Sequence, residues 1–225
     1  VLEDDEDASD LVPRARDDEL QPLLARIIEL LPEASDQHWW MLCRAARLLA
    51  DRGVKDPRVL QIVLRRYLDP QLDADQATFV LQQYDPGGTP DLIAQRLQLE
   101  MELASKPEAL KEPTLGGFFL WADLDQLLPP TYAARQELIL QAMNHPHADV
   151  RSTGYRSWRG LPKPLARTML VNGLADLSPM IRCECIQTLA YNFGAAEDLA
   201  VLRAHRAKET DRWVLEVLDG ALRKD

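Results

Sequence analysis

The chain has 225 residues, of which 46% are hydrophobic, and its formal net charge is −10. This hydrophobic fraction excludes disorder over the whole length, which requires few apolar residues. No apolar run approaches the roughly 20 residues of a membrane-spanning helix. The acidity disfavours nucleic-acid binding, because that affinity comes largely from Lys and Arg side chains that neutralise phosphates.

The charge is unevenly distributed along the chain. Residues 1–144 carry 14 basic and 26 acidic side chains, whereas residues 145–225 carry 12 basic and 10 acidic ones. Nine of the acids lie within residues 1–20. A block of like charges repels itself and is typical of a solvated segment. We therefore expect an acidic, flexible tail over residues 1–17.

Apolar residues recur at helical spacing along almost the whole chain. Leu60, Val63, Leu64, Tyr67 and Leu68, for example, follow the pattern of a helix that packs on one side. No comparable segment alternates apolar and polar residues as a half-buried strand does. The pattern predicts an all-α protein with about twelve helices, over residues 18–31, 37–52, 57–67, 73–84, 90–104, 118–128, 131–144, 149–160, 163–175, 179–193, 196–207 and 210–223.

Capping residues mark several of these helix starts. In Asp56-Pro57 and Thr89-Pro90, a residue that caps helices precedes a proline, which suits the first helical position because it lacks an N–H group. We expect Asp56 and Thr89 to be the N-caps of the helices that follow them.

Two segments in the C-terminal third repeat with a fixed spacing. Val150-Arg151 recurs as Ile181-Arg182, and a turn containing proline or aspartate precedes each pair. A third unit is expected to begin near Glu209, with Trp213 and Leu218 on its buried face. A fixed period of about 30 residues is typical of stacked helical hairpins.

This pattern resembles the short HEAT-like repeats first associated with phycobilin lyases, most clearly over residues 144–208. The resemblance implies an α-solenoid of antiparallel helical hairpins, with a concave face lined by the second helix of each hairpin. Residues 18–130 are expected to form irregular hairpins and residues 131–225 HEAT-like repeats. The resemblance also implies a structural role, capping helices and linking adjacent repeats, for the motif residues Asp149, Val150, Arg151, Asp176, Ile181 and Arg182.

No residue pattern predicts a catalytic, cofactor or metal site. Cys183 and Cys185 are two apart on an expected helix, so they point to different sides, and their apolar neighbours indicate small core residues. His145 and His147 lie at a helix entrance and lack a second ligand pair at zinc spacing. We therefore expect no enzymatic activity and no cofactor.

Two adjacent tryptophans are candidates for partner binding. Trp39 and Trp40 lie on one expected helix about 100° apart, so one can pack inward while the other lies at the edge of the apolar stripe. A partly exposed tryptophan is a common anchor in interfaces. The alternative is that the outer ring only covers a neighbouring loop.

A basic strip in the C-terminal third is the second candidate. The alternative is a solvated helix face without a partner. The strip comprises Arg156, Arg159, Lys163, Arg167, Arg203 and Arg206.

These features favour a non-enzymatic protein–protein interaction module that uses the concave face of the solenoid. The acidic N-terminal half favours a basic partner, nucleic acid is disfavoured, and the cysteine usage favours the cytoplasm. Three alternatives stay open: an immunity or inhibitor protein for a basic toxin or enzyme, a bilin-lyase-like enzyme, and a HEAT-like DNA-repair glycosylase.

Overall fold

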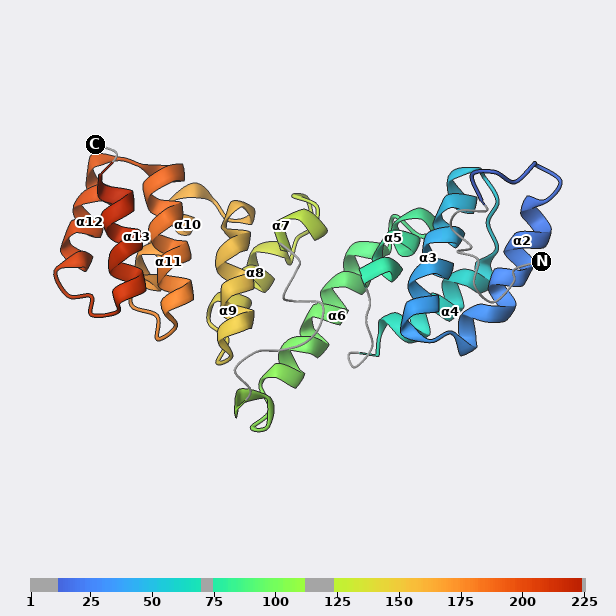
Figure 1. Ribbon diagram of the computed structural model, residues 1–225, viewed down its shortest axis with the longest axis horizontal. Coiled ribbons are helices and arrows are strands. Elements are labelled where there is room, and N and C mark those ends of the chain that lie inside the picture. Colours follow the sequence, from blue (N-terminus) through green and yellow to red (C-terminus); the bar gives the residue numbers. More distant parts are fainter. Residues whose placement is uncertain (1–11, 70–74, 112–123, 224–225) are drawn as a thin grey trace. The chain divides into compact units, whose positions relative to one another are not determined.

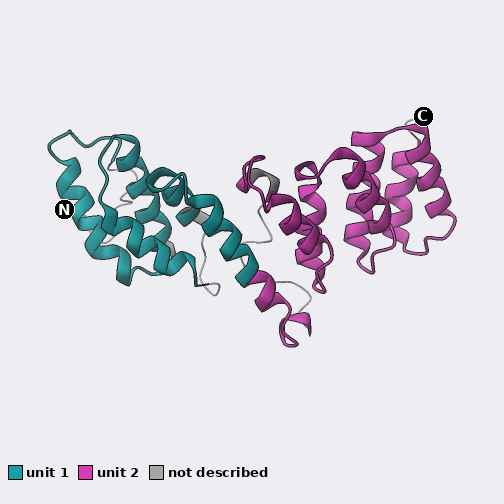
Figure 2. Ribbon diagram, turned by 180° about the vertical axis from the view of Figure 1, so that it is seen from behind, with its two compact units in different colours: residues 1–99 teal, residues 100–225 magenta. Residues whose placement is uncertain are grey.

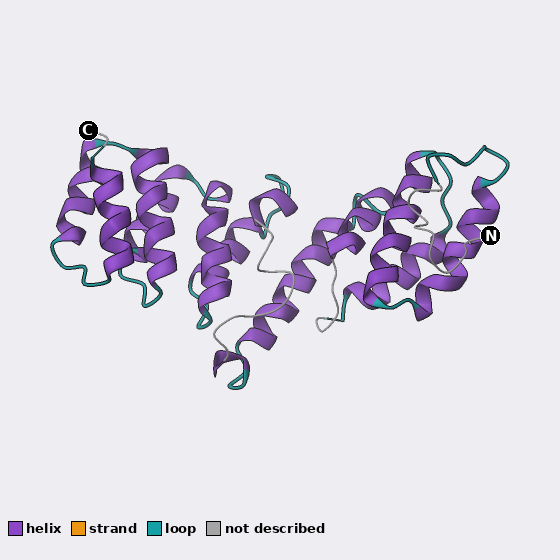
Figure 3. Ribbon diagram, viewed as in Figure 1, coloured by secondary structure: helices purple, strands orange, loops and turns teal. Residues whose placement is uncertain are grey.

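The computed structural model describes residues 12–69, 75–111 and 124–223. All regular structure within these ranges is helical (Figure 3), which confirms the predicted all-α class, and the expected number of about twelve helices is close. None of the described helices combines the length and apolarity needed to cross a membrane.

The chain divides into two compact units, residues 1–99 and residues 100–225 (Figure 2). The division falls within a helix. It lies earlier in the chain than residue 130, where we expected irregular hairpins to be followed by HEAT-like repeats. Each unit has its own buried apolar residues, such as Leu49 in the first unit and Leu170 in the second.

The first unit contains the helices α2 (Leu20–Leu30), α3 (Asp36–Asp51), α4 (Pro57–Tyr67), α5 (Asp75–Tyr84) and most of α6 (Thr89–Ala104). Helix α3 packs against both α2 and α5, and α4 packs against α5 (Figure 1). The buried guanidinium of Arg96 on α6 donates to the carbonyl oxygens of Tyr67, at 2.6 Å, and Asp69. Arg96 therefore satisfies the orphan carbonyls at the C-terminus of α4.

Part of the expected acidic tail is packed on the first unit. Val12 is buried, and the guanidinium of Arg52 donates to the carbonyl oxygens of Val12 and Ala15 at 3.0 and 2.8 Å. The same guanidinium pairs with Asp17 at 2.7 Å. Residues 12–17 are thus held at the end of α3, and the rest of the expected tail, residues 1–11, lies outside the described residues.

The second unit contains α7 (Leu124–Leu127), α8 (Arg135–Met143), α9 (Ala148–Arg156), α10 (Lys163–Gly173), α11 (Pro179–Thr188), α12 (Ala196–Arg206) and α13 (Arg212–Leu222). Helices α9, α11 and α13 pack against one another in that order (Figure 1). Helix α10 connects α9 to α11 and packs on α11, and α12 connects α11 to α13 and packs on α13. Alternate helices of this segment are therefore neighbours.

Two expected helices change type before they end. The helix expected over residues 149–160 is α9 followed by a 3₁₀ turn, η4 (Ser157–Gly160). The helix expected over residues 179–193 is α11 followed by a π-helical turn, η5 (Leu189–Phe193), which ends at Gly194 with a φ of +62°. Of the helix expected over residues 118–128, the described part is α7, and residues 112–123 lie outside the described ranges.

The two predicted N-caps have different outcomes. The Asp56 carboxylate accepts the backbone N–H of Arg58 at 2.8 Å, as a capping residue does. The prediction for Thr89 is wrong: this residue is the first of α6, and its hydroxyl donates to the carbonyl oxygen of Asp85. The Asp85 carboxylate accepts the N–H of Gly88 at 3.0 Å and so orders the turn that precedes α6.

Gly154 allows α8 and α9 to approach closely. A Cβ atom at this position would lie 2.5 Å from the backbone nitrogen of Met143 and 2.9 Å from the carbonyl carbon of Ala142. Both contacts are with backbone, so a rotamer change cannot relieve them. The spacing between α8 and α9 therefore depends on the absence of a side chain here.

We expect Gly154→Ala to destabilise the second unit, because the added methyl group forces α8 and α9 apart. Overpacking of this kind lowers the free energy of unfolding by about 1–3 kcal/mol. Gly220→Ala on α13 is the matched control, because a Cβ there has no atom within 4 Å. The control should be neutral or gain up to about 1 kcal/mol from helix propensity. Urea unfolding of both variants measures the difference, and equal stabilities would contradict the close contact.

Candidate protein-binding surfaces

Arg151 links two successive turns of the second unit. Its Nε and Nη2 groups donate to the two carboxylate oxygens of Asp176 at 2.8 and 2.9 Å. Its Nη1 group donates to the carbonyl oxygens of His145 and Pro146 at 2.9 and 2.7 Å. The guanidinium therefore stabilises the turn before its own helix α9 and holds the turn before α11.

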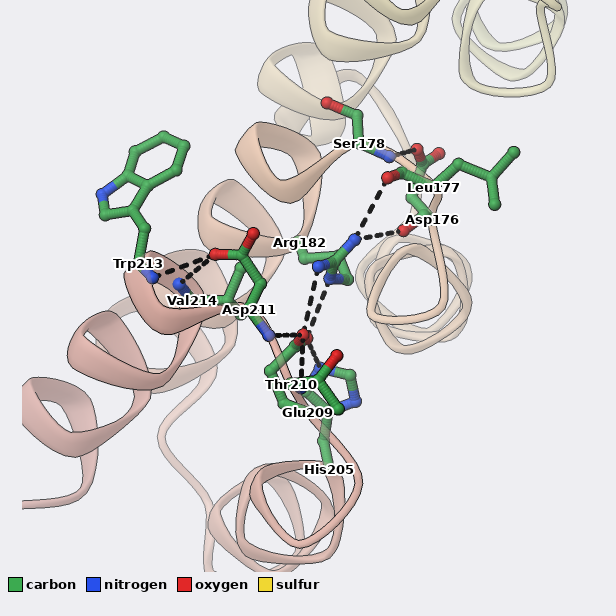
Figure 4. A network of polar contacts seen from close by, with 10 residues as sticks. All are labelled: Asp176, Leu177, Ser178, Arg182, His205, Glu209, Thr210, Asp211, Trp213 and Val214. Atoms are coloured by element: carbon green, nitrogen blue, oxygen red, sulfur yellow. Dashed lines mark hydrogen bonds and ion pairs between the residues drawn. The ribbon is translucent and has the colours of Figure 1, made fainter.

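Arg182 repeats this arrangement one period later (Figure 4). Its Nε and Nη2 groups donate to the carboxylate of Glu209 at 2.8 and 3.1 Å, and its Nη1 group donates to the carbonyl oxygens of Asp176 and Leu177 at 2.8 and 3.2 Å. The two arginines thus form a ladder along α9 and α11. Arg151 and Asp176, which the structure brings together, are both motif residues identified in the sequence. Glu209 was expected only to mark the start of the third unit, and its pairing with Arg182 was not predicted.

The acceptor carboxylates also order their own turns. Asp176 accepts the N–H of Ser178 at 2.8 Å, and Glu209 accepts the N–H groups of Thr210 and Asp211 at 3.0 and 2.9 Å. Burial alone raises the pKa of Glu209, but these N–H groups and Arg182 outweigh it and lower the pKa to about 2. Glu209 is therefore a carboxylate at any physiological pH.

The other motif residues lie inside the second unit. Val150 and Ile181 are fully buried on α9 and α11. Asp149 is buried in the first turn of α9, where its N–H donates to Nδ1 of His147 at 3.2 Å. Of the two residues expected on the buried face of the third unit, Leu218 is fully buried, but Trp213 is 53% exposed. Trp213 lies one further period after Arg182, beside the turn that Glu209 orders (Figure 4).

The two adjacent tryptophans have different environments on α3. Trp39 is only 3% exposed, and the guanidinium of Arg66 lies 4.6 Å from the centre of its ring. Trp40 is 39% exposed. The structure therefore places Trp39 in the core and leaves Trp40 available on the surface.

The exposed ring of Trp40 belongs to a surface that contains a second aromatic residue. Arg44 lies 5.4 Å from the centre of the Trp40 ring, and Arg47 lies 5.2 Å from the centre of the exposed Phe79 ring on α5. Trp40, Arg44 and Arg47 follow i, i+4, i+7 spacing and so share one face of α3. We call Trp40, Arg44, Arg47 and Phe79 the α3–α5 surface. Sequence reasoning missed Phe79 because a single Phe on a helix carries no signal of exposure.

Most of the predicted basic strip is neutralised or engaged internally. The side chain of Arg167 pairs with that of Asp198, and Arg206 pairs with Asp219. Arg156 donates to the hydroxyl of Thr153 at 3.3 Å. Arg203 is exposed on α12 and also has an interaction within the protein. These four side chains do not form a free positive strip.

The two remaining strip residues stack on aromatic rings. Trp158 in η4 and Phe193 in η5 are both half-buried, and their ring centres are 5.3 Å apart with planes inclined by 51°. The guanidinium of Arg159 lies 4.8 Å from the centre of the Trp158 ring. The ammonium of Lys163 lies 5.6 Å from the centre of the Phe193 ring. We call these four residues the Trp158–Phe193 surface.

The cysteines have the environment of core residues. Cys43, Cys183 and Cys185 are all free and buried. Burial raises the pKa of all three thiols, that of Cys183 to about 11. The reactive thiolate form is therefore scarce at neutral pH. Among the described residues, no group of His, Cys, Asp and Glu side chains could hold a metal ion.

His145 is buried with both ring nitrogens in contact with polar groups. Its Nδ1 accepts the N–H of His147 at 3.0 Å, so the ring proton lies on Nε2. Nε2 is 2.9 Å from the carbonyl oxygen of Met101 and 2.8 Å from Oγ of Ser105. Burial, supported by the nearby charges of His147 and Arg151, lowers the pKa of His145 below its ordinary value of 6.5. The ring is therefore held neutral.

Comparisons with known proteins do not suggest a function for the chain. Neither a protein family, nor a curated protein, nor a solved structure matches the chain.

We expect Arg182→Ala to lower the free energy of unfolding by about 2–4 kcal/mol, because it leaves a buried carboxylate without its charged partner. Side-chain exposures are 13% for Arg182 and 5% for Glu209, against 50% and 33% for the pair of Arg206 with Asp219. The control Arg206→Ala should therefore cost less than about 1 kcal/mol. Chemical unfolding compares the two variants, and equal losses would exclude a dominant role of the ladder.

We expect the melting temperature to fall as the pH drops below 6.5. The pKa of His145 is lower in the folded than in the unfolded chain, so its contribution to stability is present above pH 6.5 and declines as the pH falls toward the lowered value. Calorimetry between about pH 7.5 and pH 5.5 measures this slope. In His145→Gln, which cannot titrate, the slope should be smaller, and an unchanged slope would assign it to other groups.

Proposed function

We propose that the chain is a non-enzymatic protein-binding module built from HEAT-like helical repeats, and that Trp40 on the α3–α5 surface is a main contact with the partner. The observation that carries this proposal is the exposure of the Trp40 ring, under the Arg44 guanidinium, on a helix whose opposite face is packed in the core. Trp and Arg are the residue types most enriched among the side chains that dominate binding energy.

The packing of α3 supports this role. The opposite face is buried through Leu42, Cys43, Ala46 and Leu49, and α3 packs there against α2 and α5, so the helix that presents Trp40 is held in place. A rigid helix loses little conformational freedom when a partner binds, which leaves more of the contact energy as affinity. Stacking on Arg44 further limits the rotamers of the indole ring.

The repeated ladder supports the architectural part of the proposal. Arg151 and Arg182 make equivalent contacts one period apart, which is the behaviour of structural units that stack on their neighbours. Arrays of this kind present surfaces that are formed before a partner arrives. A binding function fits such a scaffold better than a catalytic function, which needs a reactive site.

The buried thiols and histidine also favour binding over catalysis. The raised pKa of Cys183 and Cys185 disfavours the thiolate that nucleophilic catalysis requires. His145 has both ring nitrogens engaged with Met101, Ser105 and His147, so it cannot reach a substrate without losing these contacts.

Affinity capture with variants of the α3–α5 surface tests the proposal. The tagged chain and its Trp40→Ala variant are each incubated with an extract of the source cells, and each captured protein is quantified by mass spectrometry. We expect one or a few proteins at near-stoichiometric amounts with the native chain and at least a tenfold loss, or more than about 1.4 kcal/mol, with Trp40→Ala.

Trp213→Ala is the matched control, because Trp213 is similarly exposed but belongs to the second unit. It should capture the same proteins in unchanged amounts, and circular dichroism melts should show that both variants remain folded. Direct titration of the purified partner then gives the dissociation constants. Equal capture by all three proteins would refute the role of Trp40, and the absence of any stoichiometric protein would refute the binding function.

A further inference from the structure

We propose that the Trp158–Phe193 surface in the second unit binds an acidic peptide segment of a protein partner. An apolar side chain of the segment packs on the aromatic pair, and flanking carboxylates pair with Arg159 and Lys163. This inference rests on the proposed protein-binding function and adds a second surface together with the chemistry that it recognises.

The aromatic pair supplies a fixed apolar platform. The rings of Trp158 and Phe193 contact each other although the residues come from different turns, η4 and η5, and both rings remain half-buried rather than fully covered. The π-helical turn η5 and the left-handed Gly194 set the backbone that carries Phe193. Single π-helical turns are rare and occur frequently at functional sites.

The cations on this platform differ from the others around them. Arg167 and Arg206 each have a carboxylate partner, whereas Arg159 and Lys163 are exposed and have no hydrogen bond or ion pair to any side chain that the structure describes. Lys163 also lies in the first turn of α10, where a positive charge opposes the helix dipole. Helix stability therefore does not account for this charge, and a carboxylate from outside the chain would complement it.

The number of available cations favours a peptide over a nucleic acid. Nucleic-acid binding draws on many phosphate contacts, on the order of six to ten. In the predicted strip, only Arg159 and Lys163 lack a hydrogen bond or ion pair to a described side chain. The net charge of −10 further opposes a polyanion with phosphates along its whole length. Two cations beside an apolar platform match a short segment with a few carboxylates.

Selection from a phage-displayed library of random peptides tests the proposal with the full chain. We expect the selected peptides to contain Asp or Glu beside an aromatic or large aliphatic residue. In fluorescence anisotropy, the double variant Arg159→Glu/Lys163→Glu should raise the dissociation constant of a selected peptide by about tenfold or more, since it replaces two attractions by repulsions.

The double variant Lys208→Glu/Arg212→Glu is the matched control, because it changes the net charge equally at two other exposed positions of the second unit. Its dissociation constant should stay within about twofold, since exposed charges away from the contact act weakly. Equal weakening by both double variants, or selection of peptides without carboxylates, would overturn the proposal. Binding of labelled oligothymidine in place of the peptides would overturn it in favour of nucleic acid.

The test separates this inference from the proposed function. If Trp40→Ala abolishes capture of a partner while Arg159→Glu/Lys163→Glu changes neither that capture nor peptide binding, the binding function stands and the acidic-peptide surface is refuted. Thermal melts of both double variants confirm folding, which exposed substitutions of this kind should preserve.

Discussion

The arrangement of α9, α11 and α13 depends on the guanidinium groups of Arg151 and Arg182. Each group donates to two carbonyl oxygens of the turn before its own helix and, through its other edge, to the carboxylate of the next turn. A planar guanidinium with five donors can do both at once, and a lysine ammonium cannot offer the same fork. The ladder thus couples the conformation of each turn to the position of its neighbour, and the apolar faces then pack in one register.

The helices and the repeated unit could be predicted because their signals are periodic, whereas the pairing of Arg182 with Glu209 was not predicted. Apolar spacing located α4, and the recurrence of Val150-Arg151 as Ile181-Arg182 identified the repeated unit. Trp213 shows the limit of the same reasoning. The period places it at the position of Arg151 and Arg182, and it was expected on the buried face of the third unit. Its indole is instead exposed beside a turn that Asp211 and Glu209 order through backbone N–H groups. A period gives the position of a residue, whereas burial depends on what packs against it.

The ion pairs within the basic strip could not be predicted because their acidic partners are distant in sequence. Asp198 is 31 residues from Arg167, and Asp219 is 13 residues from Arg206, so neither pairing follows from local spacing. The contact of Trp158 with Phe193 has the same origin, since it needs both the 3₁₀ turn and the π-helical turn at the ends of two helices. For the adjacent tryptophans, helical geometry required different environments but did not determine which ring is buried.

The net charge and the local charge of the candidate surfaces favour different partners. A chain with a charge of −10 attracts basic molecules at long range. Both aromatic surfaces nevertheless present cations, Arg44 and Arg47 on one and Arg159 and Lys163 on the other. At physiological ionic strength the field is screened beyond about 8 Å, so the side chains that touch the partner decide which groups are recognised. An acidic contact segment is then selected at close range, and the negative field around it disfavours partners that are acidic throughout.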